Sequence, residues 1–288
     1  MSGAFQDYRL MYDEPSSGAG RSGIDAWNAE LPIGNGRMGA MVYGDTPVER
    51  LQLNEESIWA GPPLPDHLPG ATTAIAEARE LLFQNKVEEA ERIVKERVLL
   101  PHTGPRSYQP FGELWLEDIN AQVVEATTAG EGERSDYRRE LDLDTAIATV
   151  EYVRAGVAHR REMFVSATDQ VLVLYWSVDK RQSLSCKLSL TRDGSARIEA
   201  IGTDGLLLTG QAEHRGTHAG VCFAGCVKAV PQGGHVQADG ESLIIRDVDS
   251  LTAYVAIRTC LQLGRVGWCR ACVRGADSKS ISNGSRIV

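Results

Sequence analysis

Residues 31–61 have the sequence LPIGNGRMGAMVYGDTPVERLQLNEESIWAG, in which a glycine-rich run passes into two runs of alternating apolar residues. Clustered glycines are typical of tight turns or of close backbone approach, so we expect a loop at 32–37. An apolar residue at every second position is typical of a strand, which predicts strands at about 38–44 and 48–54. The Asp-Thr-Pro sequence at 45–47 predicts the turn that joins them.

The second of these strands runs into a polar cluster that ends in a tryptophan. Asn54 and Glu55 supply groups that hydrogen-bond sugar hydroxyls, and Trp59 supplies a flat face for sugar C–H groups. This combination is consistent with a sugar-binding rim at the end of the strand, although the chemistry alone favours the structural interpretation that follows. The alternative is purely structural, with the strand leading into a helix cap and Trp59 packed in the core.

The rest of the chain is largely a series of short strand-like runs separated by turn signals. Residues 146–165 predict a hairpin, and the continuous apolar run at 171–177 predicts a strand buried on both faces. Many short strands at this spacing predict an all-β fold, a large antiparallel β-sandwich. Hairpin turns are expected at four Asp-Gly or Gly-Gly pairs, 193–194, 204–205, 233–234 and 239–240. Further strands are expected at 5–14, 113–117, 139–143, 183–191, 196–200, 205–209, 219–230, 235–238, 242–246 and 252–258.

Two short helices interrupt this strand pattern. Apolar residues recur at helical spacing over 71–84 and 86–99, and the second stretch begins with acidic residues, which the helix dipole favours near an N-terminus. Pro101 predicts the end of the second helix. We expect this two-helix insertion, at about 71–99, to cover a sheet edge or to contact a neighbouring part of the protein.

The charge balance excludes some classes of partner. The formal net charge is −9, which argues against nucleic acid or an anionic membrane surface as the main partner. No apolar run approaches the ~20 residues of a membrane-spanning helix. The start has no basic segment followed by an apolar stretch, so we expect no secretory signal and, if Met1 is the true start, a cytoplasmic protein.

We expect no metal and no cofactor. Cys222 and Cys226 fall on one face of an expected strand and are interpreted as inert core thiols. The C-x-x-C pair that begins at Cys269 has zinc or redox spacing but no second pair nearby. The pair His214 and His218 would share one side of a strand, but the intervening glycine favours a loop.

No pair of carboxylates predicts a catalytic acid and base. Glu55 and Glu56 are adjacent, so on a strand they point to opposite faces. Asp142 and Asp144 would share one face, and ordinary solvated positions are the favoured interpretation for them. Glycosidic bond cleavage needs two carboxyl groups that face one bond, and the sequence does not identify such a pair.

Three stretches carry a family resemblance. Residues 31–61, SYQPFGELWL at 107–116 and DYRRELDLDTA at 136–146 resemble, in order, signatures of glycoside hydrolase family 95, the inverting α-L-fucosidases and their α-L-galactosidase relatives. The resemblance covers about residues 5–259 and implies the amino-terminal β-sandwich domain of that family, at 1–259. The family's catalytic (α/α)6 barrel would lie outside this chain.

The resemblance also implies a function and a set of site residues. It implies the amino-terminal domain of an α-L-fucosidase-like hydrolase that acts on terminal α-L-fucosyl or α-L-galactosyl residues, with a fucosylated glycan as ligand and the catalytic barrel as intramolecular partner. Five residues are expected at the substrate rim or the barrel interface. Asn35 and Asn54 would donate hydrogen bonds, Arg37 would orient the ligand, Trp59 would stack or pack, and Glu55 would join them. No catalytic residue is expected, so the chain alone should be inactive.

Two alternatives stay open, and the tail is unusual. The chain could be a stand-alone carbohydrate-binding module that uses the same rim, or a non-functional truncated product with an exposed apolar surface. Residues 260–288 lose all periodicity and are basic. We interpret them as an irregular tail, disordered or derived from an altered reading frame, with an ordinary flexible terminus as the alternative.

Overall fold

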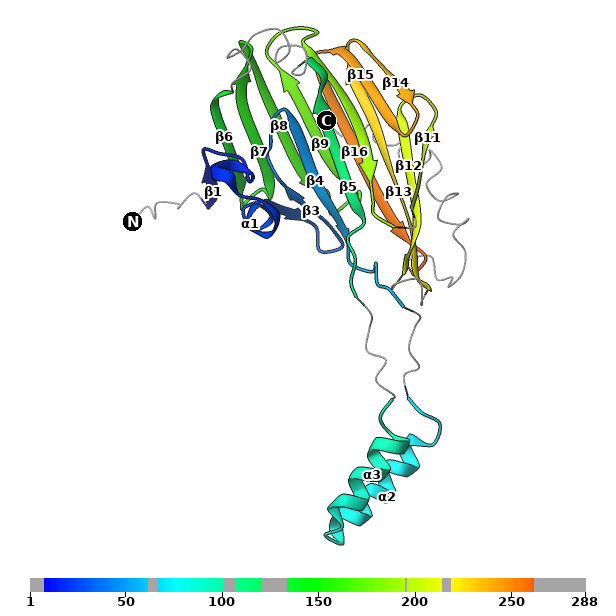
Figure 1. Cartoon of the computed structure of the whole chain (residues 1–288). Helices are drawn as coiled ribbons and strands as arrows, with labels where there is room; N and C mark the ends of the chain where they lie inside the picture. The colour runs from blue at the N-terminus through cyan, green and yellow to red at the C-terminus, as the bar shows by residue number, and fades with distance from the viewer. Residues whose placement is uncertain are drawn as a thin grey trace, which may run out of the picture.

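The fold is a sandwich of two antiparallel sheets from which a helical hairpin stands away (Figure 1). The computed structural model describes residues 8–61, 67–100, 107–120, 134–194, 196–213 and 219–261. The expected all-β sandwich with a two-helix insertion is confirmed. No helix in these ranges is long and apolar enough to cross a membrane.

The larger sheet has nine strands, and the last strand of the described chain lies inside it. Strand β16 is inserted between β9 and β13, which are joined to each other through it alone. In spatial order the strands are β1 (Arg9–Tyr12), β6 (Ser135–Asp142), β7 (Ile147–Arg154), β8 (Val157–Val165), β9 (Leu172–Val178), β16 (Ser250–Thr259), β13 (Ala219–Gln232), β12 (Gly205–Glu213) and β11 (Ala196–Ile201).

The smaller sheet has seven strands and holds most of the opening motif. Its inward residues and those of the larger sheet interdigitate in one continuous core, as sandwich packing requires. In spatial order the strands are β14 (His235–Asp239), β15 (Ser242–Val248), β10 (Leu184–Thr191), β5 (Gly112–Asp118), β4 (Val48–Glu55), β3 (Met38–Val42) and β2 (Leu31–Gly34).

The first correction concerns the start of the opening motif. Residues 31–34 form strand β2, where we expected a loop, and β2 pairs with β3 with Gly34 opposite Gly39. Alternate burial of Leu31 and Ile33 stabilises this strand, so the turn shrinks to residues 35–37. The two strands expected after it are confirmed as β3 and β4.

The second correction concerns strand β9, for which we expected burial on both faces. Leu172, Leu174 and Trp176 are buried, whereas the intervening Val173 and Tyr175 are only half-buried. The strand therefore alternates, because the outer face of the nine-stranded sheet is not covered there by a second layer. A continuous apolar run reports β-propensity and does not report how many faces are packed.

The expected hairpin turns separate into two kinds. The pairs at 204–205 and 239–240 lie in true hairpins, β11–β12 and β14–β15, and the hairpin expected at 146–165 is confirmed as β7–β8. The pairs at 193–194 and 233–234 instead carry the chain from one sheet to the other. Turn residues predict that the chain reverses, and they do not predict which strand it pairs with next.

The two expected helices are confirmed as α2 (Ala71–Phe83) and α3 (Val87–Arg97). They pack on each other through a small apolar cluster of Ala74, Ala78, Ala90 and Ile93. The hairpin stands clear of both sheets, so the expectation that it covers a sheet edge is wrong (Figure 1). The alternative, a contact with a neighbouring part of the protein, stays a prediction. Phe83 at its tip is 78% exposed. The short elements η1 (Gly18–Gly20) and α1 (Gly23–Asn28), which we did not expect, precede β2.

The interior between the sheets contains an ion pair as well as apolar side chains. Arg161 on β8 and Glu49 on β4 are both fully buried, with Nη1 and Oε2 3.0 Å apart. The Arg161 guanidinium also donates to the Tyr152 hydroxyl at 2.8 Å and lies over the Trp176 ring. These bonds satisfy charges that would otherwise be costly to bury, and they connect the two sheets.

Candidate functional site

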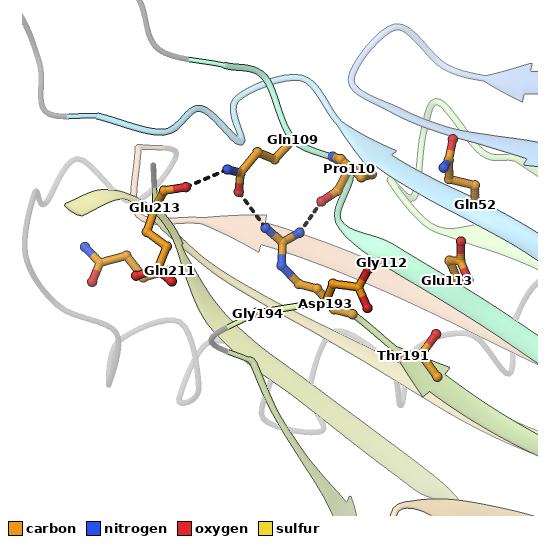
Figure 2. Close-up of a pocket in the computed structure, with 11 residues that line it drawn as sticks. Gln52, Gln109, Pro110, Gly112, Glu113, Thr191, Asp193, Gly194, Gln211 and Glu213 are labelled. Atoms are coloured by element: carbon orange, nitrogen blue, oxygen red, sulfur yellow. Dashed lines mark hydrogen bonds between the residues drawn. The ribbon is translucent and has the colours of Figure 1, made fainter. Parts of the chain in front are cut away.

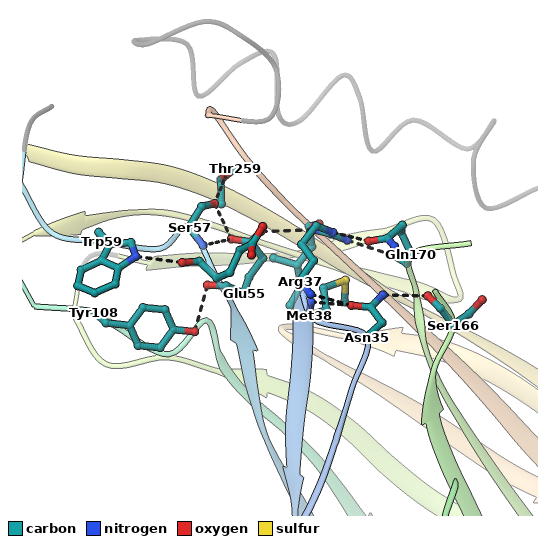
Figure 3. Close-up of polar contacts among 12 residues, drawn as sticks. Asn35, Arg37, Met38, Glu55, Ser57, Trp59, Tyr108, Ser166, Gln170 and Thr259 are labelled. Carbon is teal, nitrogen blue, oxygen red and sulfur yellow. Dashed lines mark hydrogen bonds and ion pairs between the residues drawn. The ribbon is translucent and has the colours of Figure 1, made fainter. Parts of the chain in front are cut away.

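Polar side chains from both sheets meet at one end of the sandwich (Figure 3). We call this group the strand-end cluster, and it comprises Asn35, Arg37, Glu55, Ser57, Gln170 and Thr259. Its members come from the β2–β3 turn, the ends of β4 and β16, and the turn before β9. Three of the five expected site residues, Asn35, Arg37 and Glu55, are therefore brought together here.

Arg37 bridges the two sheets. Its Nε donates to Gln170 Oε1 at 2.5 Å, and its Nη1 donates to the backbone carbonyl of Ile257 at 3.0 Å. The same Nη1 lies 3.5 Å from Glu55 Oε1. Burial lowers the pKa of the Arg37 guanidinium, and Arg258 lowers it further, whereas Glu55 raises it. The guanidinium is thus committed to protein partners and its side chain is only 16% exposed.

Asn35 shapes the turn that presents Arg37. Its Oδ1 accepts hydrogen bonds from the backbone N–H groups of Arg37 at 3.1 Å and Met38 at 2.9 Å. Its Nδ2 donates to the backbone carbonyl of Ser166 at 2.9 Å, which connects the turn to the other sheet. The Asx turn and its neighbour Gly36, at a φ of +91°, explain why Asn-Gly occurs here.

Glu55 completes the cluster from the smaller sheet. Its side chain is fully buried, and Oε2 accepts from the Ser57 backbone N–H at 2.9 Å and from the Ser57 hydroxyl at 2.7 Å. The Ser57 hydroxyl also lies 2.7 Å from Thr259 Oγ1 at the end of β16. The hydrogen bonds therefore run continuously from the opening motif to the last described strand.

The other two expected site residues, Asn54 and Trp59, lie on the outer surface. Trp59 and Tyr108 are each 40% exposed and pack edge to face, with ring centroids 5.4 Å apart. Trp59 Nε1 donates to the carbonyl of Glu56, and the Tyr108 hydroxyl donates to the carbonyl of Glu55 at 3.1 Å. Asn54 Oδ1 lies 3.4 Å from that hydroxyl. We call Trp59 and Tyr108 the aromatic pair.

The rim or interface role of all five residues stays a prediction.

A second polar region, which the sequence analysis did not identify as a site, is a pocket of about 460 Å³ (Figure 2). It opens beside the ends of β4, β5, β10 and β12. We refer to it as the outer pocket. Its described lining consists of Gln52, Gln109, Pro110, Gly112, Glu113, Thr191, Arg192, Asp193, Gly194, Gln211 and Glu213. Four of these lie in the second motif, at 107–116, so a signal was present in the sequence.

Arg192 holds one wall of the outer pocket in place. Its guanidinium donates to the carbonyls of Pro110 and Phe111 and, at 2.8 Å, to Gln109 Oε1. Burial lowers the pKa of Arg192, and Asp193 beside it raises the pKa. Gln109 in turn donates from Nε2 to the carbonyl of Glu213 at 2.7 Å (Figure 2). Because its hydrogen bonds are made to the protein, the Arg192 guanidinium has a structural role here.

The opposite wall is formed by strands of the smaller sheet. Glu113 is ion-paired with Arg50, whose guanidinium lies over the Trp115 ring at 5.3 Å from the centroid. Trp115 Nε1 donates to the Thr191 hydroxyl at 2.9 Å. Behind this wall, burial raises the pKa of the Glu30 carboxyl to about 7, although the Tyr43 hydroxyl and Arg50 lower it.

The metal and thiol candidates of the sequence analysis divide by location. Cys222 and Cys226 are buried on one face of β13 in a small apolar cluster, in agreement with the prediction of core thiols. The pair that begins at Cys269, and both His214 and His218, lie outside the described residues. Within the described ranges, no group of three His, Cys, Asp or Glu side chains could hold a metal ion.

Asp142 and Asp144, which we considered as a carboxylate pair, do not lie on one strand. Asp142 is the last residue of β6, and its Oδ1 accepts hydrogen bonds at 3.0 Å from the backbone N–H groups of Asp144 and Thr145. These backbone hydrogen bonds lower the pKa of Asp142. Asp142 thus stabilises a turn, and Asp144 does not share its strand face.

The sequence is similar to those of known carbohydrate-active enzymes. Residues 10–262 match a family model described as glycosyl hydrolase family 65, N-terminal domain. Over 163 residues the chain is 39% identical to "Alpha-L-fucosidase 2" of Arabidopsis thaliana. This alignment covers 57% of this chain and 18% of the plant protein. Over 153 residues the chain is 34% identical to "Probable alpha-fucosidase A" of Aspergillus niger, covering 50% and 17% of the two chains. The match therefore spans less than a fifth of these relatives.

A solved structure shares the fold. It is described as "Putative kojibiose phosphorylase from human microbiome", and it has a TM-score of 0.50 and 11% sequence identity. The alignment covers 98% of this chain and 36% of that one. At this identity the likeness concerns the fold alone.

Proposed function

Because the chain belongs to the family of glycosyl hydrolase family 65 N-terminal domains, we propose that it is the N-terminal β-sandwich domain of an α-L-fucosidase-like hydrolase. The activity would be directed at terminal α-L-fucosyl or α-L-galactosyl residues of glycans. The observation that carries the proposal is the 39% identity to a plant protein named as an α-L-fucosidase. The three motifs that resemble glycoside hydrolase family 95 support the same conclusion.

In this proposal the domain supplies a rigid scaffold and another part of the enzyme supplies the chemistry. Cleavage of a glycosidic bond requires an acid and a base on the two sides of the bond. Of the carboxylates in the outer pocket, Glu113 is paired with Arg50, and Asp193 and Glu213 are exposed. Glu55 is buried but is enclosed by Arg37 and Ser57. We therefore assign no catalytic role to these groups.

The strand-end cluster supports the proposal because it would brace the strand ends beneath a surface that packs against a catalytic barrel. It fixes the β2–β3 turn and the ends of β4 and β16 in one arrangement through hydrogen bonds between the sheets. A loop held in this way can position a neighbouring domain without changing shape. Asn35, Arg37 and Glu55 would then act by holding the interface, with Asn54 and Trp59 at its exposed margin.

A chimera tests this proposal. Residues 10–262 would replace the matching domain of the Arabidopsis relative, and hydrolysis of an aryl α-L-fucoside would be measured. We expect the chimera to be active and the 288-residue chain alone to be inactive. An Arg37→Ala chimera should lose activity or become unstable, whereas an Arg160→Ala chimera, altered at an exposed ion pair, should not. A folded but inactive chimera, or turnover by the chain alone, would contradict the proposal.

A second candidate function is a stand-alone carbohydrate-binding module. The observation that favours it is the aromatic pair, because two partly exposed rings beside Asn54 offer a stacking surface next to a hydrogen-bonding group. Saturable binding of fucosylated glycans by the chain, abolished by Trp59→Ala, would support it. Absence of binding together with an active chimera would favour the hydrolase domain.

A further inference from the structure

The outer pocket is distinct from the strand-end cluster and plays no part in the function proposed above. We propose that the outer pocket is a binding subsite for a neutral sugar, which it recognises through the sugar hydroxyls. Its volume of about 460 Å³ lies within the range of about 300–1,000 Å³ that is usual for small-molecule sites. The proposal does not rest on the hydrolase activity, because a sugar could bind here whether or not it is cleaved.

The polar groups of the pocket match a ligand with many hydroxyls. Asp193 and Glu213 are exposed carboxylates, which accept hydrogen bonds and donate none when ionised. Gln52 accepts from Trp27 Nε1 at 2.9 Å through Oε1, which directs its amide nitrogen as a donor. A sugar hydroxyl can donate to the first kind of group and accept from the second, so both kinds can be satisfied by one ring.

The charges of the pocket disfavour anionic ligands and metal ions. Arg192 is the one Arg or Lys among the described lining residues, and its guanidinium is occupied by two backbone carbonyls and Gln109. No free cation is therefore left among those residues to hold a phosphate or a carboxylate. Glu113 is neutralised by Arg50, and the remaining acids form no cluster that could hold a metal ion.

The walls of the pocket are fixed before any ligand arrives. Arg192 joins the strand-β5 side to the strand-β10 side, and its guanidinium also lies 4.3 Å from the centroid of the Phe223 ring. On the other side, Trp115 is joined to Thr191 and partly covered by Arg50. A preformed site loses less conformational entropy on binding, which favours a weakly interacting ligand such as a sugar.

Two indoles lie next to the pocket and are joined to its lining residues by hydrogen bonds. Trp27 is 38% exposed and is joined to the pocket through Gln52. Trp115 is half-buried beside Thr191 at the other side. Indole faces can contact the C–H groups of a sugar ring while the carboxylates and amides hold its hydroxyls. An anion site would have no use for these carboxylates, and spermidine in the test below measures whether a cationic amine uses them.

The test is calorimetric titration of the full 288-residue chain at pH 7 with five probes. L-fucose, D-galactose and D-glucose are neutral sugars, D-galacturonate is an acidic sugar, and spermidine is a polyamine. We expect at least one neutral sugar to bind with a dissociation constant on the order of millimolar, and to bind more tightly than the two charged probes. The Asp193→Ala/Glu213→Ala double variant should weaken that binding about tenfold or more.

The matched control is Asp239→Ala/Glu241→Ala, which removes one Asp and one Glu from another exposed turn and should bind as the unaltered chain does. Trp59→Ala separates the outer pocket from the aromatic pair, because binding in the outer pocket does not require the Trp59 ring. The proposal is overturned if no neutral sugar binds, if a charged probe binds more tightly, or if the pocket variant binds normally. Loss of binding in Trp59→Ala with normal binding in the pocket variant would overturn it as well.

Discussion

The strand-end cluster and the outer pocket are both polar regions that include residues of the sequence motifs, yet they use their polar groups in opposite ways. In the cluster, Arg37 and Glu55 direct their hydrogen bonds at other parts of the protein. In the pocket, Asp193 and Glu213 hold exposed carboxylates beside an open volume. The difference teaches that a polar sequence motif can have a purely structural role. A binding site is better recognised by side chains whose hydrogen-bonding groups face an open volume.

The largest expected effect is the loss of the guanidinium that bridges the sheets. Arg37→Ala removes its bonds to Gln170 and Ile257 and leaves the buried Glu55 without its cation. We expect the free energy of unfolding to fall by about 3 kcal/mol, measured by urea denaturation. Arg160→Ala, at an exposed ion pair, should cost less than about 1 kcal/mol. Equal losses of unfolding free energy in the two variants would show that the strand-end cluster does not stabilise the contact between the sheets.

The second effect sharpens the comparison at the wall behind the outer pocket. The pKa of Glu30 is raised from its usual value of 4.5 to about 7. Between these values the unfolded chain releases the proton and the folded chain keeps it. The contribution of Glu30 to stability should therefore fall as the pH rises through this window, by about 3 kcal/mol, and level off above pH 7.

Glu30→Gln should remove this contribution, so its unfolding free energy should change less between pH 5 and pH 8 than that of the unaltered chain. Glu241→Gln, at an exposed position, should leave the pH profile as it is. Denaturation at a series of pH values measures both. A Glu30→Gln variant with an unaltered profile would show that this carboxyl does not control the slope.

A smaller effect is expected from Asn35, which shapes the turn within the cluster. Asn35→Ala removes the acceptor for two backbone N–H groups and the donor to Ser166, and should cost about 1–2 kcal/mol. Asn35→Asp keeps the acceptor and loses the donor, so it should cost about half as much. Thermal unfolding of both variants separates the two contributions. If Asn35→Asp is less stable than Asn35→Ala, the hydrogen bonds within the turn are not the main contribution of Asn35 to stability.

The smallest effect is expected in the outer pocket. Asp193→Ala and Glu213→Ala remove exposed side chains, so each should change the free energy of unfolding by no more than about 0.5 kcal/mol. The same urea denaturation used for Arg37 measures it. A loss comparable to that of Arg37→Ala would mean that these carboxylates stabilise the fold, and the contrast between the two regions would disappear.

The fold was largely predictable because it depends on local periodicity. Alternation of apolar and polar residues is imposed by burial on one face, so β4, β7 and β16 could be located from the sequence. The alternation of apolar and polar residues does not predict which of the two sheets a strand joins. The turn at 193–194 leaves the smaller sheet for the larger one, and nothing in its Asp-Gly pair distinguishes it from the hairpin turn at 239–240.

The site was less predictable because its contacts are distant along the chain. Arg37 was identified as a site residue from its motif, but its partners Gln170 and Ile257 lie 133 and 220 residues away. The buried pair of Glu49 and Arg161 is separated by 112 residues. Gln109 and Glu113 stood in a recognised motif, and only the fold shows that they face a pocket shared with β10 and β12. Such pairings are set by topology, which a linear pattern does not encode.

The central place of β16 has a consequence for synthesis. Strands β9 and β13 are joined only through β16, so each presents an open edge until the ribosome has released the chain as far as Thr259. Open edges recruit strands from other molecules. The nascent chain is thus prone to aggregate before β16 emerges, and insertion of that strand unites two half-sheets in a single step.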